Sequence, residues 1–203
     1  MKEPLYRRLL LISGSFLVFC LLYYGSAYLG DSFQHRYRLY FDWERNIPLV
    51  PEAAFVYMSA TLMFLPIFRK LPTAAQLWPL SLTLAAEQLL AGICFYLLPL
   101  EDGFPTGPVP TGLSGAMWRL AGTVAMRHNY LPSLHVALAT TAAMVYARAV
   151  GRPSWPMNVW AAAIALSTLL IHQHHVADVI AGFLLAQLGV RLLYDRLAAQ
   201  PVV

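Results

Sequence analysis

The uncharged run LLLISGSFLVFCLLYYGSAYLG, residues 9–30, decides the class of fold, because it is long and apolar enough to be a membrane span. A helix needs about 20 predominantly apolar residues to cross the roughly 30 Å hydrocarbon core of a bilayer. Lys2, Arg7 and Arg8 precede the run, as basic residues precede the core of a signal peptide, but the run exceeds the usual length of such a core. We therefore predict a retained transmembrane helix.

Composition extends this prediction to the whole chain. Of the 203 residues, 59% are hydrophobic and 12% are charged, whereas soluble domains have roughly 45 to 50% and about 25%. Five further, largely apolar segments have the length of a helix: residues 53–68, 71–100, 132–147, 153–171 and 175–193. They leave no room for a separate soluble domain. We predict an all-α, polytopic membrane protein in which residues 1–203 form a single domain of six transmembrane helices.

The basic residues indicate how these helices are oriented. With the N-terminus inside, nine lysines and arginines fall on the cytoplasmic side and five on the outer side, in agreement with the positive-inside rule. We predict a multi-pass protein of a bacterial cytoplasmic membrane, with both termini in the cytoplasm. Because the basic residues are spread in ones and twos at helix ends, the formal charge of +4 does not indicate a nucleic-acid surface. The expected partners are the lipid bilayer and a membrane lipid substrate.

The histidines gather on one side of this arrangement. All six fall in outer connections or at outward helix ends: His35, His128, His135, His172, His174 and His175. Ionisable groups within membrane spans are costly and usually functional. The outer face is therefore the candidate site of reaction, whereas Glu87, midway along the third span, is predicted to join helices.

The motif NYLPSLH, residues 129–135, stands where a long outer connection, residues 99–131, enters the fourth span. Proline is tolerated at a helix start, because its missing N–H would have no partner there. The free N–H groups of the first turn, the Ser133 hydroxyl and the positive end of the helix dipole together favour an anion. His135 lies in the same turn. Alternatively, the motif is a helix cap followed by an incidental histidine.

The motif HQHHVAD, residues 172–178, stands at the outward start of the sixth span. Residues four apart share a helix face, so Asp178 is placed to accept a hydrogen bond from His174 and fix its tautomer. A carboxylate-oriented imidazole is a better nucleophile. His175 lies further round the helix, and we predict a structural role for it.

Together the two motifs indicate in-line phosphoryl transfer at the extracytoplasmic face. One histidine attacks phosphorus, and the other protonates the leaving lipid oxygen. N–H and cationic groups hold the remaining phosphate oxygens. This chemistry requires no metal and no other cofactor.

Residues 132–135, PSLH, and residues 173–182, QHHVADVIAG, resemble the second and third signatures of the type 2 phosphatidic acid phosphatase superfamily. The resemblance covers about residues 42–189. It implies a phosphohistidine intermediate on His174, orientation of that histidine by Asp178, and acid-base catalysis by His135.

Other features are similar to the inositol phosphorylceramide synthase-like branch of that superfamily. They are Leu134 next to the histidine, Asn129 six residues before it, the Ser167-Thr168 pair, and the stretch IPLVP at residues 47–51. This similarity implies that transfer to an alcohol is as plausible as hydrolysis.

Two basic parts of the superfamily pattern are missing. A lysine followed by an Arg-Pro pair is replaced by PLEDGFPTGP, residues 99–108, and the arginine of the third signature is replaced by Thr168. Other groups must therefore neutralise the phosphate. Arg127 is our first choice, whereas Arg119 could equally sit at the lipid headgroups. The predicted phosphate-binding residues are Ser133, Asn129, Arg127 and His172.

These residues are compatible with three functions. The leading hypothesis is a membrane enzyme, either a lipid phosphate phosphatase or a lipid headgroup phosphotransferase. The second is a metal-dependent membrane hydrolase, because imidazoles and a carboxylate suit zinc or iron. The third, prompted by the missing basic signature, is a non-catalytic binder or transporter of lipid phosphates. The metal hypothesis uses His135, His172, His174 and Asp178.

Overall fold

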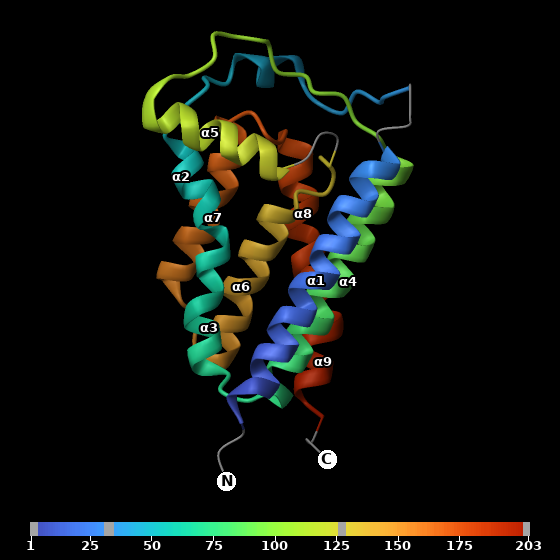
Figure 1. Ribbon diagram of the computed structural model, residues 1–203, viewed down its shortest axis with the longest axis vertical. Helices are drawn as coiled ribbons and strands as arrows, with labels where there is room; N and C mark the ends of the chain where they lie inside the picture. Colours follow the sequence, from blue (N-terminus) through green and yellow to red (C-terminus); the bar gives the residue numbers. More distant parts are fainter. Residues whose placement is uncertain (1–3, 31–34, 126–128, 201–203) are drawn as a thin grey trace.

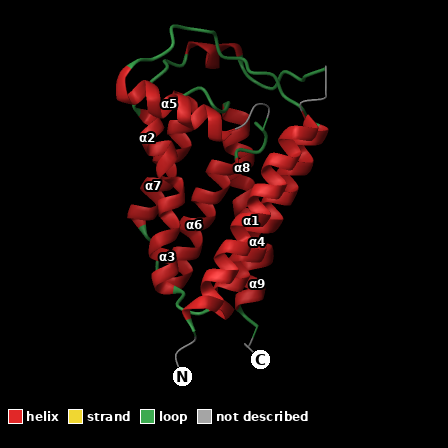
Figure 2. Cartoon of the chain, in the orientation of Figure 1, coloured by secondary structure: helices red, strands yellow, loops and turns green. Residues whose placement is uncertain are grey.

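A computed structural model describes residues 4–30, 35–125 and 129–200 of the chain. These residues form helices and connecting loops, and within the described ranges no strand is present beyond one isolated bridge between Tyr37 and Leu100. Figure 2 shows the predominance of helix. The all-α class predicted from the sequence is confirmed.

The helices follow one another with mostly short connections. Their bounds are α1 Leu5–Gly30, η1 Asp42–Asn46, α2 Ala53–Met58, η2 Ser59–Met63, α3 Phe64–Lys70, α4 Ala74–Leu97, α5 Gly112–Ala125, α6 Leu134–Val150, α7 Trp155–Leu170, α8 Val176–Gly189, η3 Val190–Tyr194 and α9 Asp195–Ala198. The segments α2, η2 and α3 run on without a break, and so do α8, η3 and α9, in which η3 is a π-helical turn.

Three helices are long and apolar enough to cross a membrane: Leu5–Ser26, Ala74–Leu97 and Val176–Ala198. Two shorter apolar helices, Leu134–Val150 and Trp155–Leu170, stand beside them. Large apolar side chains also face outward from the bundle, for example Leu10 and Phe16, which are 67% and 66% exposed. These features support a membrane protein, and the layout of six spans stays a prediction.

The long helices form a bundle, and α5 lies across one end of it (Figure 1). This end carries the starts of α6 and α8, with His135 and His174, and we call it the histidine end. The other end carries the end of α6 and the start of α7, with Arg152, and we call it the arginine end. Helix α1 begins and α9 finishes at the arginine end.

Helix α5 was not among the predicted helices. It lies in the 99–131 stretch that the sequence suggested as an outer connection. Its small residues Ala121 and Ala125 are buried against Ala54 and Tyr57 of α2, while Leu113 is 74% exposed. The helix is amphipathic and too short to span a bilayer, so the search for membrane-length apolar runs passed over it.

Local sequence explains where several helices begin and end. Thr73 and Gln76 form a reciprocal capping box at the start of α4. Gly151 ends α6 in the left-handed conformation, with φ of 69°, which glycine adopts without steric cost. A buried apolar core toward the arginine end then holds the helices together, and it includes Met63, Ile67, Leu77, Ile164 and Val190.

Candidate active site

The start of α6 is built around Ser133, which is fully buried. Its side-chain oxygen accepts a hydrogen bond from Val136 N at 3.4 Å, so Ser133 is the N-cap of α6, as in the alternative interpretation of this motif as a helix cap. Its backbone N–H donates to the Asp178 carbonyl oxygen at 3.0 Å. The starts of α6 and α8 are therefore joined directly at the backbone.

A glycine makes this close approach possible. A β-carbon at Gly182, one turn into α8, would lie 2.4 Å from the carbonyl oxygen of Ser133 and 3.2 Å from the side chain of Val136. Any larger residue must push the two helix starts apart. Gly182 thus sets the spacing between the two histidine motifs.

His174 and Asp178 lie side by side, but the hydrogen bond that the four-residue spacing predicted is not formed, and His174 precedes the first residue of α8. The Nδ1 atom of His174 lies 3.5 Å from Oδ2 of Asp178, and both side chains are buried. The same Oδ2 accepts a hydrogen bond from the backbone N–H of His175 at 2.8 Å. The backbone N–H of His174 donates to the Thr168 carbonyl oxygen at 3.2 Å, which fixes the loop between α7 and α8.

His135 lies in the first turn of α6, where its ring stacks on Tyr57 of α2. The ring centroids are 3.9 Å apart and the planes differ by 23°. His135 follows Ser133 by two residues, and the backbone of Ser133 is hydrogen-bonded to that of Asp178, so the structure brings together the two motifs that the sequence singled out.

Glu44, in η1 of the outer connection, is a site residue that sequence reasoning missed. Its side chain is fully buried, and Oε2 accepts a hydrogen bond from Val176 N at 2.8 Å. His175 Nδ1 lies 3.1 Å from the same oxygen. Because a carboxylate only accepts hydrogen bonds, His175 Nδ1 carries the proton. Glu44 therefore caps α8 from a distant loop and fixes the ring of His175.

Aromatic rings hold His172 and His175 in place. Phe104 stacks on His172 at 4.1 Å and on His175 at 4.2 Å, and Tyr40 stacks on His175 at 4.7 Å. Arg38 lies 4.7 Å above the Tyr40 ring, and its hydrogen bond to Asp42 raises the pKa of the guanidinium. These contacts fasten the outer connections onto the histidine end.

His172 is turned toward the outer connection. It adopts a φ of 60°, which is uncommon for a residue other than glycine. Its Nε2 lies 2.9 Å from the carbonyl oxygen of Ile47, and a carbonyl accepts, so Nε2 carries a proton and donates. The phosphate-binding role predicted for His172 is not tested by this contact, which engages the ring with the backbone.

Two further candidates for phosphate binding, Asn129 and Arg119, donate to backbone carbonyls, and Arg127 lies outside the described ranges. Asn129 is buried, and its amide donates to the backbone carbonyl of Tyr23 in α1 at 3.3 Å. Arg119 is on α5, where it donates to the Pro110 carbonyl oxygen at 2.9 Å. Arg127 and His128 lie outside the described residues.

A cavity of about 670 Å³ opens at the histidine end next to this site. Its wall combines Arg119 and Thr123 of α5 with Asp102 and Gln173 from the connections. Asp102 accepts a hydrogen bond from Phe104 N at 3.1 Å. Asp102 therefore contributes an acidic residue to this wall.

The four residues of the alternative metal hypothesis do not form a metal site. In the part of the chain that the structure describes, no group of three or more His, Cys, Asp or Glu side chains is arranged to hold a metal ion. His172 faces Ile47, whereas His174 faces Asp178. Instead, His174 lies beside Asp178, and His175 lies beside Glu44.

Comparison with known proteins gives one match. A family model described as the PAP2 superfamily matches residues 51–200, which include α2 to α9 and both histidine motifs. No curated protein and no solved structure matches the chain.

Proposed function

We propose that this chain, which belongs to the PAP2 superfamily, is a membrane enzyme that transfers the phosphoryl group of a lipid phosphate or phosphodiester through a phosphohistidine. Membership in the superfamily indicates a phosphatase or phosphotransferase. The lipid substrate, the covalent intermediate and the roles of individual residues belong to the proposal.

The observation that carries the proposal is the backbone junction between the two motifs. Ser133 N donates to the Asp178 carbonyl oxygen at 3.0 Å, so the first turn of α6 lies against the first turn of α8. The N–H groups at the start of α6 favour a phosphate oxygen. His135 lies in that turn, and His174 lies two residues before α8 begins. This arrangement supports a proposal in which the α6 turn binds the phosphate anion and the nearby imidazole of His174 attacks it.

In the first step, Nε2 of His174 attacks phosphorus, because Nδ1 is the nitrogen that faces Asp178. The N–P bond forms, the P–O bond to the leaving alcohol breaks, and His135 donates a proton to that oxygen. Asp178 stabilises the positive charge that develops on the imidazole. In the second step His135 takes a proton from water or an alcohol, which attacks phosphorus and releases His174.

The acceptor in the second step decides between a phosphatase and a headgroup transferase. The cavity of about 670 Å³ beside the site is large enough for a polar acceptor, and its wall carries both an acidic and a basic side chain. A water molecule needs no such cavity. We therefore include alcohol acceptors in the test of function.

Radiolabelled lipid phosphates and phosphodiesters, incubated with the purified full chain, test the proposal. We expect release or transfer of the labelled phosphoryl group and an acid-labile label on His174. His174→Ala should lower turnover on the order of 10⁴-fold or more, whereas His35→Ala, at an exposed histidine of the same end, should not. Full turnover by His174→Ala, or no turnover of any lipid by the native chain, would contradict the proposal.

A further inference from the structure

Tyr57 of α2 is a residue of the histidine end to which the proposed mechanism gives no role. Its side chain is fully buried. Its ring stacks on the imidazole of His135, with the centroids 3.9 Å apart. Because the hydroxyl is bonded directly to that ring, it lies close to the first turn of α6.

The hydroxyl of Tyr57 has no hydrogen-bond partner among the described residues. The side chain belongs instead to a cluster of apolar residues, which also contains Ala54, Ala121, Ala125 and Ile171. A phenol that is buried without a partner loses its hydration and gains no hydrogen bond in return. Such groups are rare in folded proteins, and a catalytic or binding role is one of the few explanations for them.

Tyr23 of α1 shows that the protein can satisfy a buried tyrosine at this end. Its side chain is also buried, and its hydroxyl donates to the carbonyl oxygen of Ala125. Ala125 belongs to the same apolar cluster as Tyr57. The fold therefore gives a partner to one of these two hydroxyls, and it leaves the other to a ligand.

The second histidine motif also carries buried polar atoms that have no partner among the described residues. They are Nδ1 of His174, Nε2 of His175 and Oδ1 of Asp178. The site is thus closed around several unsatisfied polar atoms, of which the Tyr57 hydroxyl is one. Catalytic hydrogen bonds are often formed fully only when the substrate is bound.

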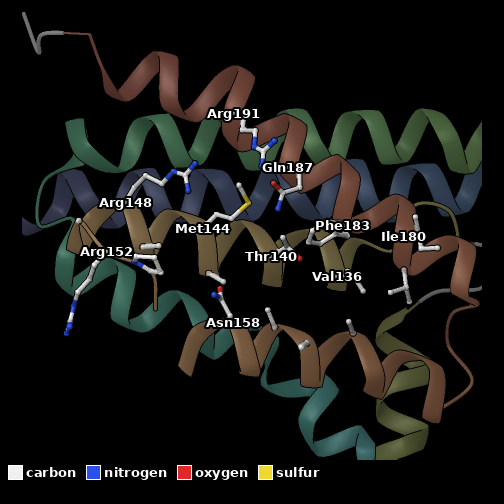
Figure 3. Close-up of a pocket in the computed structure, with 18 residues that line it drawn as sticks. Val136, Thr140, Met144, Arg148, Arg152, Asn158, Ile180, Phe183, Gln187 and Arg191 are labelled. Carbon is white, nitrogen blue, oxygen red and sulfur yellow. The ribbon is translucent and has the colours of Figure 1, made fainter. Parts of the chain in front are cut away.

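The groove that runs along α6, α7 and α8 does not supply a ligand to Tyr57 (Figure 3). Val136 lines this groove, whereas Tyr57 and His135 do not. Successive residues of a helix point about 100° apart around its axis, so His135 and Val136 face different sides of α6. The ligand of Tyr57 therefore lies on the side of α6 that faces α2.

We propose that the Tyr57 hydroxyl donates a hydrogen bond to a non-bridging oxygen of the substrate phosphate, next to the N–H groups of the first turn of α6. This inference rests on the proposed function. A tyrosine hydroxyl keeps its proton at neutral pH and is a donor. Preorganised neutral donors stabilise the negative charge of the transition state. Because two basic parts of the superfamily pattern are missing, the phosphate needs such donors.

Tyr57→Phe in the purified full chain tests the inference, because it removes the hydroxyl and keeps the ring on His135. We expect kcat/KM for a lipid phosphate to fall roughly 10²-fold, as for the loss of one oxyanion donor. Orthovanadate, which mimics the transferring phosphoryl group, should bind about tenfold more weakly, as for the loss of one hydrogen bond to a charged group. The shift of thermal unfolding with vanadate concentration measures this affinity without turnover.

Thermal unfolding without vanadate separates this role from a structural one. Loss of a buried hydroxyl that has no partner should leave the midpoint of Tyr57→Phe unchanged or raise it. Tyr23→Phe is the contrast, because the Ala125 carbonyl would lose its donor and the midpoint should fall. Tyr194→Phe, at a buried tyrosine of the arginine end, should leave kcat/KM and vanadate affinity unchanged.

Native kcat/KM and native vanadate affinity in Tyr57→Phe would overturn the inference and leave the proposed function intact. A lower unfolding midpoint with both properties unchanged would do the same, because the hydroxyl would then serve the fold alone. If the native chain turns over no lipid, the proposed function fails. The inference then stands only if vanadate binds the native chain and binds Tyr57→Phe more weakly, and any other result overturns it as well.

Discussion

The starts of α6 and α8 lie against each other, yet they have opposite electrostatic character. Both are helix N-termini at the histidine end, and each carries roughly half a positive charge from the helix dipole. At α8 this charge is met by two buried carboxylates, Asp178 and Glu44, which accept from His175 N and Val176 N. At α6 the cap is the neutral hydroxyl of Ser133.

This difference assigns different roles to two similar pieces of structure. In the described part of the chain no carboxylate hydrogen-bonds to the first turn of α6, so its N–H groups remain suited to a phosphate anion. The start of α8 is already occupied by negative charge, and it would repel phosphate. That charge instead supports His174 through Asp178. One helix start is suited to binding the substrate anion, and the other to orienting the nucleophile.

Asp178→Asn removes one of the two negative charges at the start of α8 and should have the largest effect on turnover. The amide oxygen can still accept from His175 N, so the cap is kept, while the charge beside His174 is lost. We expect the rate of phosphoryl transfer to fall by roughly 10³ to 10⁴-fold, because the imidazole loses its orienting carboxylate. Phosphate release from a lipid phosphate measures the loss. Asp195→Asn, at the arginine end, is the control and should keep its activity.

Ser133→Asp places a negative charge at the start of α6, like the negative charge that the start of α8 already carries. Aspartate is also a good N-cap, so the helix start should persist. The new carboxylate repels phosphate, and we expect turnover to fall on the order of 10² to 10³-fold. Ser133→Asn is the neutral control of similar size. Equal activity of the two variants would show that the start of α6 does not bind the phosphate.

Gly182→Ala breaks the contact between the two helix starts. The added methyl would lie 2.4 Å from the Ser133 carbonyl oxygen, so the helices must separate. We expect a loss of about 1 to 3 kcal/mol in stability, as for other overpacked sites, together with lower turnover. Thermal unfolding in detergent measures the first effect. Gly14→Ala, where nothing lies within 4 Å, should not destabilise the chain.

Glu44→Gln removes the other negative charge at the start of α8 and should have the smallest effect on turnover. Glutamine keeps one acceptor oxygen, so it can accept from Val176 N or from Phe41 N but not from both, and the negative charge beside His175 is lost. Because Glu44 positions His175 and the start of α8, the substitution should lower kcat about tenfold, or about 1.4 kcal/mol, and leave KM unchanged. Glu52→Gln, at an exposed acid before α2, serves as the control. A change in KM alone would assign Glu44 to substrate binding instead.

The parts of the site that were predicted correctly are local in sequence. Asp178 lies beside His174, four residues earlier in the sequence, and Ser133 caps α6, which the sequence offered as one of two interpretations of its motif. The helix at 112–125 and the role of Glu44 were not predicted. Glu44 is 131 residues from His175 along the chain, and an acidic residue in a loop has no local pattern that distinguishes a buried carboxylate from a solvated one.

The sequence by itself determined an all-α chain with apolar helices of membrane length and two histidine motifs at helix starts, because helix periodicity and capping act over one or two turns. Only the tertiary structure decided which carboxylates face each helix start. The backbone contact between Ser133 and Asp178, the approach at Gly182 and the Glu44 cap all join residues far apart in the chain. Such contacts arise from packing several helices at once, and no single segment encodes them.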